Sequence, residues 1–310
     1  MDKHPLLIIL GPTASGKTKL AVHASLNLGG EIISADSRQV FNGMDIGTGK
    51  DLNEYTINGQ AIPYHLINIR EAGEQYNVNA FKEDFYTLFE QLTNRGRLPI
   101  VCGGTGMYIH SLLQNQPYTA VPVNQVFRDS LPAHDINALR ALLAFYPKEV
   151  TDHADLSSAK RLVRALEIAE YLNHHTLTTA VAPAMDPLVI GLNGDVELRR
   201  SRIFKRLNAR FDSGLIEEVA GLLQRGVSAD MLIFYGLEYK FVTSYLQNEI
   251  SLPELKEKLY IAICQFAKRQ MTFFRKMEKD GVVINWLDAS LETEELSAMV
   301  TKLYLENYKL

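Results

Sequence analysis

The segment Leu6-Leu-Ile-Ile-Leu-Gly-Pro-Thr-Ala-Ser-Gly-Lys-Thr18 joins a short apolar run to the pattern G-x-x-x-x-G-K-T. This spacing is typical of a loop that binds the phosphates of a di- or triphosphate, because its glycines permit a tight turn with backbone N–H groups directed at an anion. The apolar run suits a buried strand, and the residues after the loop suit a helix whose positive N-terminal end faces the same anion. We therefore expect a phosphate-binding loop made of Gly11, Pro12, Thr13, Ala14, Ser15, Gly16, Lys17 and Thr18.

Two side chains of this loop carry the expected chemistry. Lys17 supplies a positive charge for a terminal phosphate, and the Thr18 hydroxyl is placed to ligate Mg²⁺, which makes Mg²⁺ the expected cofactor. The loop alone leaves two reactions open. It can hold a nucleoside triphosphate whose terminal phosphoryl group is transferred, or a diphosphate that departs from carbon as a leaving group.

Strand and helix signals alternate over the first third of the chain. Apolar runs bounded by turn residues predict strands, and longer segments with helical spacing predict the helices between them. The expected strands are residues 6–10, 31–34, 65–69 and 98–102, and the expected helices are residues 17–28, 80–94 and 107–113. Short, continuously apolar runs suit parallel strands buried on both faces. We therefore expect an α/β fold with a P-loop NTPase-like core and a parallel sheet.

The pattern changes after Leu113. Residues 114–124 contain two prolines and little periodicity, and the apolar spacing of residues 127–179 is helical throughout. A return strand is expected at residues 188–192, followed by a mostly helical part with a late strand at residues 282–287. We expect three parts, namely a core at residues 1–114, an inserted all-helical lobe at residues 115–187, and a return to the core at residues 188–310.

The composition is that of a globular protein without a membrane span. Of the 310 residues, 46% are hydrophobic and 22% are charged, and no stretch approaches the ~20 apolar residues that a spanning helix needs. The first apolar run is too short for a signal peptide. Two cysteines, Cys102 and Cys264, are too few for a disulfide framework, so we expect a cytoplasmic protein.

Basic residues are clustered although the net charge is −4. Residues 199–210 contain six cations and no acid, and smaller clusters lie at residues 160–164 and 268–276. A local basic surface on an acidic protein can follow the phosphates of a nucleic acid. Helix faces that pair with nearby carboxylates are the alternative, and the sequence leaves both open.

Polar residues follow two more of the expected strands. Asp36 comes directly after residues 31–34, and Thr105 lies in a Gly-Gly-Thr-Gly turn directly after residues 98–102. The carboxyl ends of parallel strands meet at one edge of a sheet, so both residues are expected beside the phosphate-binding loop. Position alone leaves three roles open for Asp36, which are a general base, a water-mediated metal ligand, and the cap of a following turn.

Taken in order, these segments resemble the tRNA dimethylallyltransferases (tRNA isopentenyltransferases) of bacterial type. The resemblance rests on seven motifs that follow one another in the family's order. They are Gly11-Pro-Thr-Ala-Ser-Gly-Lys-Thr18, Ile33-Ser-Ala-Asp-Ser-Arg-Gln-Val40, Gly43-Met-Asp-Ile-Gly-Thr48, Gly103-Gly-Thr-Gly-Met-Tyr108, Arg161-Leu-Val-Arg-Ala-Leu-Glu167, Gly214-Leu-Ile-Glu-Glu-Val219 and Ala267-Lys-Arg-Gln-Met-Thr-Phe-Phe-Arg275.

The resemblance implies transfer of a dimethylallyl group from dimethylallyl diphosphate to N6 of the adenosine 3′ to the tRNA anticodon (position 37), with release of diphosphate. It implies that Asp36 is the general base and that Lys17 and Thr18 hold the diphosphate with Mg²⁺. Thr105 and Arg206 are then expected to contact the diphosphate and the reacting centre.

The resemblance also implies a monomer that binds the anticodon stem-loop, with the helical lobe as a tRNA-binding part. The implied tRNA contacts are Asp36, Ser37, Arg38, Gln39, Thr105, Arg128, Lys160, Arg161, Leu162, Val163 and Arg164.

The chain departs from the family pattern on the acceptor side, at Asn68, at Gln265 and at residues 235–240, whereas the phosphate-binding loop is intact. Transfer to free AMP, ADP or ATP is therefore kept as an alternative reaction. A P-loop small-molecule kinase and a non-catalytic RNA-binding module are the further alternatives.

Overall fold

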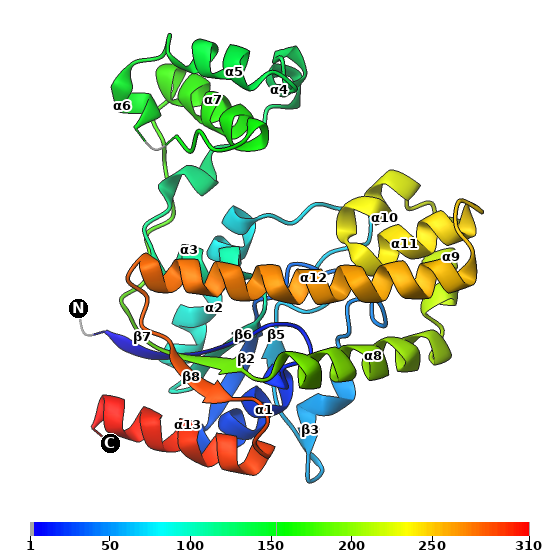
Figure 1. The fold of residues 1–310 in the computed structure, drawn as a ribbon. Coiled ribbons are helices and arrows are strands. Elements are labelled where there is room, and N and C mark those ends of the chain that lie inside the picture. The colour runs from blue at the N-terminus through cyan, green and yellow to red at the C-terminus, as the bar shows by residue number, and fades with distance from the viewer. Residues whose placement is uncertain (1–2, 153, 310) are drawn as a thin grey trace. The chain divides into compact units, whose positions relative to one another are not determined.

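A six-stranded sheet forms the centre of the larger of two compact units in this computed structural model, which describes residues 3–152 and 154–309 (Figure 1). The ends of the expected first and third parts, Met1, Asp2 and Leu310, lie outside the described residues. The larger unit contains residues 1–114 and 182–310, and the smaller unit contains residues 115–181. The smaller unit therefore ends earlier than the expected boundary at residue 187.

All pairings in the six-stranded sheet are parallel, and the strand order is β5-β2-β6-β1-β7-β8. The strands are β1 (His4–Leu10), β2 (Gly30–Ser34), β5 (Tyr64–His65), β6 (Leu98–Gly103), β7 (Met185–Asn193) and β8 (Asn285–Asp288). Strand β1 lies between β6 and β7, so the phosphate-binding loop leaves the middle of the sheet. The expected α/β fold with a parallel sheet is confirmed.

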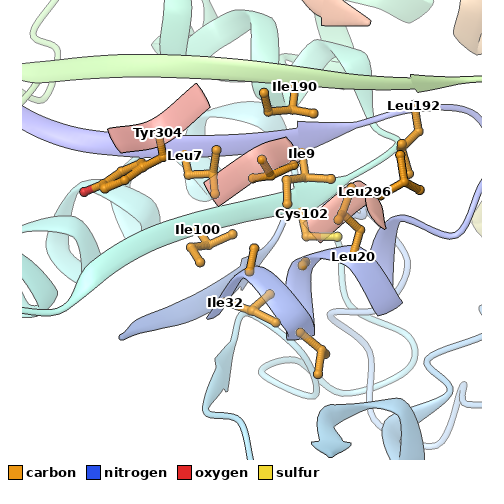
Figure 2. Close-up of a cluster of buried hydrophobic side chains, with 14 of the residues drawn as sticks. Leu7, Ile9, Leu20, Ile32, Ile100, Cys102, Ile190, Leu192, Leu296 and Tyr304 are labelled. Carbon is orange, nitrogen blue, oxygen red and sulfur yellow. The ribbon is translucent and has the colours of Figure 1, made fainter. Parts of the chain in front are cut away.

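Strand β1 is apolar on both faces because helices cover both faces of the sheet. Leu7 and Ile9 pack into one hydrophobic cluster, whereas Leu6, Ile8 and Leu10 pack into another. Helices α1 (Lys17–Leu28) and α13 (Thr293–Tyr308) cover the first face, where Figure 2 shows Leu7, Ile9, Leu20 and Leu296 among the buried side chains. Helices α2 (Val78–Asn94), α3 (Gly106–Leu113) and the second half of α12 (Leu252–Lys279) cover the other face.

A third hydrophobic cluster joins the C-terminal helices to the segment that follows β2. It contains Val40, Phe41 and Met44 from that segment together with side chains from helices α8 to α12. The helices not yet given are α8 (Val196–Asp212), α9 (Leu215–Gln224), α10 (Ala229–Tyr235) and α11 (Leu237–Leu246). Helix α12 thus contributes to two clusters, and it begins at Ser251 with a capping box closed by Glu254.

The described part of the smaller unit is helical and has a core of its own. Its elements are η2 (Pro117–Ala120), α4 (Gln125–Ser130), α5 (Ile136–Leu143), α6 (Lys148–Thr151) and α7 (Ala159–His174). Leu139 and Leu143 of α5 pack against Leu162, Leu166 and Ala169 of α7.

Several elements differ from the expected ones. The strand expected at residues 65–69 is limited to Tyr64–His65, because Leu66 and Asn68 adopt positive φ angles of 60° and 57° that a strand does not allow. Strand β7 begins at Met185 and β8 at Asn285. A short hairpin, β3 (Thr56–Ile57) and β4 (Gln60–Ala61), follows the 3₁₀ helix η1 (Leu52–Tyr55). No helix among the described residues is long and apolar enough to cross a bilayer.

Candidate active site

The carboxyl ends of β1, β2 and β6 border one cavity of about 290 Å³ in the larger unit. Lys17, Asp36 and Thr105 all line it, so the structure brings together the residues expected at the three strand ends. Its other lining residues from these strand ends are Thr13, Thr18, Ser37, Arg38, Gln39, Cys102, Gly103, Gly104, Gly106 and Met107.

The phosphate-binding loop has the backbone that its glycines predict. Gly16 has a φ of 89° and is the N-cap of α1, so the loop turns into the helix through a left-handed residue. A Cβ atom at Gly11 would lie 2.8 Å from the carbonyl oxygen of Leu192, which shows how closely the loop passes β7. The amide groups at the start of α1 are therefore available to an anion beside the loop.

Lys17 lies where its ammonium group can bind an anion. Its Nζ donates to the carbonyl oxygen of Pro12 at 2.8 Å. Burial of the ammonium group, together with the nearby positive charge of Arg206, lowers the pKa of Lys17 to about 8. An anion bound here would offset both effects, because it would compensate the charge of Lys17.

Asp36 is held in a turn that presents it to the cavity. Ala35 N donates to Cys102 O at 2.8 Å, and Asp36 Oδ1 accepts a hydrogen bond from Arg38 N at 3.0 Å. This bond closes the turn at residues 37–40, so Asp36 does cap the turn that follows it, which was one of the three roles left open by the sequence. A Cβ atom at Gly103 would lie 2.2 Å from Ala35 O, so the close approach of β6 to this segment requires glycine.

Thr105 connects the turn after β6 to the segment that carries Asp36. Its Oγ1 accepts from Ser37 N at 3.1 Å, and its own amide donates to Ala35 O at 3.1 Å. Thr105 is also the N-cap residue of α3, although its side chain does not cap that helix. Its hydroxyl is therefore used to fix the position of the Asp36 segment.

Residues 43–51, which we call the glycine loop, form another wall of the cavity. Arg206 and Arg210 reach this loop from α8. Arg206 Nη2 donates to Gly49 O at 3.1 Å and to Asp51 Oδ2 at 2.5 Å. Arg210 Nη1 donates to Gly47 O at 3.3 Å and to Glu238 Oε1 at 2.9 Å.

Glu218 of α9 fastens the glycine loop from outside the cavity. Its carboxylate accepts from three consecutive backbone amides, which are Asp45 N and Ile46 N at 2.7 Å and Gly47 N at 2.9 Å. It also accepts from the hydroxyl of the fully buried Tyr239 at 2.8 Å. Three hydrogen bonds from the loop therefore converge on one carboxylate, which the Tyr239 hydroxyl holds in place.

Lys50 fixes the end of the same loop. The side chain is 1% exposed, and its Nζ donates to Phe41 O and to Asp45 Oδ1, both at 2.6 Å. It also donates to Asn68 Oδ1. Asn68, one of the departures from the family pattern, is therefore engaged in supporting the glycine loop.

A second cavity of about 430 Å³ shares Lys17, Thr18 and Arg206 with the first. Asp51 and Glu54 also line it. Burial raises the pKa of Glu54, and the neighbouring Asp51 raises it further. The second cavity is thus lined both by cations, Lys17 and Arg206, and by carboxylates, Asp51 and Glu54.

Three residues of α12 at this site were missed by the sequence analysis as site residues. Gln270 accepts from Thr13 N at 2.8 Å and donates to Gly104 O at 2.9 Å, so it joins two of the strand-end loops. Phe266 and Arg269 line the cavity, and the guanidinium of Arg38 lies 5.6 Å from the Phe266 ring centre. Arg269 and Gln270 lie in the last of the seven motifs, and Arg269 also belongs to the basic cluster at residues 268–276, whereas Phe266 directly precedes that motif.

The smaller unit corrects part of the expected tRNA-binding set. The side chain of Leu162 is completely buried in the core of this unit, so it is not available to a nucleic acid. Arg128 and Arg164 are instead engaged by the buried Glu167, with Arg128 Nη2 at 2.7 Å from its carboxylate. Burial acts to raise the pKa of Glu167, but the hydrogen bonds from both arginines outweigh this effect and the pKa is lowered.

The sequence left two roles open for the basic cluster of α8, which were contact with phosphates and pairing with carboxylates on a helix face. The structure contains arginines of both kinds. Arg206 and Arg210 line the first cavity, and Arg202 lines the second. Arg200 pairs with Glu197 on the same helix at 2.8 Å, as a solvated helix face would. In the smaller unit, Lys160 and Arg161 are exposed, and the half-buried Val163 follows them.

The donors at the site suit a magnesium ion that arrives with a phosphate ligand. The described residues contain no group of three or more His, Cys, Asp or Glu side chains that could hold a metal. Thr18 lines both cavities and offers a hydroxyl oxygen, which is the type of ligand that Mg²⁺ prefers. Phosphate oxygens and water would have to complete the coordination.

A central parallel strand that runs into a phosphate-binding loop and then a helix defines a P-loop protein of the α/β class. Residues 39–277 match the family described as IPP transferase, and residues 4–71 match the family described as isopentenyl transferase. The chain belongs to the IPP transferase family, and the family resemblance of the sequence is thereby confirmed.

Individual relatives agree with this assignment. The chain is 49% identical to tRNA dimethylallyltransferase 1 of Porphyromonas gingivalis over 97% of this chain and 100% of that protein. It is 48% identical to tRNA dimethylallyltransferase 2 of Bacteroides fragilis, over 95% of this chain and 96% of that protein. The crystal structure of the tRNA isopentenylpyrophosphate transferase of Bacillus halodurans superimposes with a TM-score of 0.71, at 30% identity over 99% of both chains.

Proposed function

We propose that the protein transfers the dimethylallyl group of dimethylallyl diphosphate to N6 of adenosine 37, next to the tRNA anticodon, and releases diphosphate. One observation carries the proposal for the site. A phosphate-binding loop, a carboxylate (Asp36) and a guanidinium (Arg206) line a single cavity of about 290 Å³. The relatives named tRNA dimethylallyltransferase support the substrates.

The phosphate side of the cavity would stabilise the leaving group. Breaking the bond between C1 of the allyl group and the diphosphate oxygen leaves negative charge on the diphosphate and positive charge on the allyl carbon. Lys17, Arg206 and the amides of the phosphate-binding loop lie where they can compensate that negative charge. Mg²⁺, held by Thr18 and the phosphate oxygens, would supply further charge compensation when bound.

The carboxylate side of the cavity would take a proton from the nucleophile. The N6 amine of adenine is a weak nucleophile because its lone pair is delocalised into the ring. As the N6–C1 bond forms, the amine becomes acidic, and Asp36 accepts its proton as the general base. The hydrogen bonds from Arg38 N to Asp36 Oδ1 and from Ser37 N to Thr105 Oγ1 keep the Asp36 segment in place during this step.

The acceptor base must leave the anticodon stack to reach the cavity, and RNA loops allow bases to be splayed out in this way. In the larger unit we assign tRNA contacts to Ser37, Arg38, Gln39 and Thr105. In the smaller unit we assign them to the exposed Lys160 and Arg161, with Val163 beside them. Arg128 and Arg164 would act through Glu167, by maintaining the fold of that unit. We further propose that the enzyme is a cytoplasmic monomer.

Incubation with labelled dimethylallyl diphosphate and Mg²⁺ tests the proposal when tRNA, AMP and ATP are offered separately. We expect label in tRNA alone, with a tRNA that carries guanosine at position 37 as the matched control. Label in AMP or ATP would indicate the free-nucleotide reaction instead. Conversion of ATP to ADP without prenyl transfer would indicate a kinase and contradict the proposal.

A further inference from the structure

We infer that Asp51 is a counter-ion that competes with diphosphate for Arg206 and so limits how tightly the enzyme holds its product. This inference rests on the proposed function, because it assumes that diphosphate occupies the phosphate-binding loop. It concerns a carboxylate to which neither the sequence motifs nor the mechanism above assigns a role.

The geometry shows that the Asp51 carboxylate is committed to Arg206. The two side chains meet at 2.5 Å, and Arg206 also donates to Gly49 O from the same nitrogen. Asp51 precedes the 3₁₀ helix η1, but its side chain does not cap that helix. A carboxylate at a helix start normally caps the helix amides, so its engagement with the guanidinium is a distinct use of this residue.

The charges explain why Arg206 needs a partner when no phosphate is bound. Arg206 lines both cavities together with Lys17, and its charge contributes to lowering the pKa of Lys17. Two cations so close repel each other unless an anion lies between them or beside one of them. Asp51 supplies such an anion, with its Oδ2 at 2.5 Å from Arg206 Nη2.

The same carboxylate opposes a bound diphosphate. Asp51 and Glu54 both line the second cavity, so a diphosphate at the loop faces two like charges. Binding must therefore draw Arg206 from Asp51 or share it, and departure of diphosphate restores the ion pair. Asp51 lowers the affinity for dimethylallyl diphosphate and for the product alike, and it favours release of the product.

The ion pair of Arg206 with Asp51 is more exposed than the pair of Arg210 with Glu238, so the Arg206 pair is the one that can exchange its partner. The side chains of Arg210 and Glu238 are each only 12% exposed, whereas those of Arg206 and Asp51 are 33% and 43% exposed. Separation of the buried pair would leave an uncompensated charge inside the protein. Water can solvate Asp51 when Arg206 turns to a phosphate, so this exchange is inexpensive.

Titration calorimetry with inorganic diphosphate and Mg²⁺ tests the inference on the full chain. We expect Asp51→Asn to lower the Kd of diphosphate about tenfold, or about 1.4 kcal/mol. The product-inhibition constant against dimethylallyl diphosphate should fall by the same factor. Asn tolerates the positive φ of 44° at this position, so the loop is preserved. Asp51→Gly, which also suits that φ, should change the Kd in the same direction.

Glu197→Gln is the matched control, because it removes one acid that pairs with an arginine of the same helix outside both cavities. It should leave the Kd of diphosphate unchanged. A Kd for Asp51→Asn that equals or exceeds that of the unaltered protein would overturn the inference, since Asp51 would then be neutral or helpful to binding. Absence of diphosphate binding by the unaltered protein would instead contradict the phosphate site and the proposed function with it.

Discussion

At the scale of single residues, a substitution at Asp36 can remove the proton acceptor without disturbing the local structure. Asn at this position can still accept the hydrogen bond from Arg38 N through Oδ1, so the turn is retained while the base is lost. We expect Asp36→Asn to lower single-turnover prenyl transfer by about 10²–10⁴-fold, the range for loss of a general base. Diphosphate affinity should be unchanged. A transfer rate close to that of the unaltered protein would remove Asp36 from the mechanism.

Lys17 is a residue at which function opposes stability. Its pKa is about 8 in the folded protein and 10.5 in the unfolded chain, so the desolvated charge destabilises the ligand-free fold below pH 8. The penalty disappears as the pH rises to 10.5, because the unfolded chain binds more protons in this window. Lys17→Met should therefore raise the free energy of unfolding at pH 7 by up to about 3 kcal/mol.

Urea denaturation at pH 7 and at pH 10 measures this effect of Lys17→Met. The gain in stability should be smaller at the higher pH, and diphosphate binding should be lost at both. Lys19→Met on the exposed side of α1 is the matched control and should change stability little. A variant at Lys17 that is less stable at pH 7 would contradict the assignment of a desolvation penalty.

At the scale of elements, the sequence predicted the helices and strands whose first and last residues are marked by local signals. The bounds of α1 were predicted to the residue, because Gly16 and Gly29 delimit this helix. The hairpin at β3 and β4 was missed although its turn, Asn58-Gly59, is a strong hairpin signal and follows Thr56 and Ile57, which have high β-propensity.

The contacts that shape the site were beyond sequence reasoning because they join distant elements. Glu218 lies more than 150 positions from the glycine loop that it fastens, and Gln270 lies even further from Thr13. The family motifs contained both residues but did not show which atoms they contact. Asp51 likewise had no pattern that could reveal its pairing with Arg206.

A substitution of Glu218 tests whether this residue holds the glycine loop in position. Glu218→Gln replaces an acceptor oxygen by an NH₂ group that faces backbone donors, so we expect a loss of about 2–3 kcal/mol in unfolding free energy. The KM for dimethylallyl diphosphate should rise, because Gly49 O no longer orients Arg206. Thermal melts and steady-state kinetics measure both effects. The exposed neighbour Glu217→Gln is the control, and equal behaviour of the two variants would refute the role.

At the scale of the whole molecule, the two units have separate hydrophobic clusters and separate charge networks. Glu167 is the centre of the network in the smaller unit, where it accepts from Arg128, Arg164 and the amide of Asn124. Glu167→Gln leaves two arginines poorly compensated, so we expect the smaller unit to lose about 3–5 kcal/mol of stability.

Because the phosphate-binding loop lies in the other unit, Glu167→Gln should weaken tRNA binding and leave the Kd of diphosphate unchanged. Binding titrations with each ligand separate the two effects, and the exposed Glu149→Gln is the control. Loss of diphosphate affinity in Glu167→Gln would show that the units are energetically coupled.

The insertion of residues 115–181 between β6 and β7 also matters for a chain emerging from the ribosome. Strand β1 is synthesised well before β7, one of the two strands with which it pairs, since His4 of β1 pairs with Met185 of β7. The nascent β1 must wait with one hydrogen-bonding edge unpaired until the entire insertion has been translated, while the insertion itself can fold through local contacts. Synonymous codons that slow translation once β7 has left the ribosomal exit tunnel should therefore raise the yield of native enzyme, whereas a pause within residues 115–181 should prolong the exposure of that edge to aggregation.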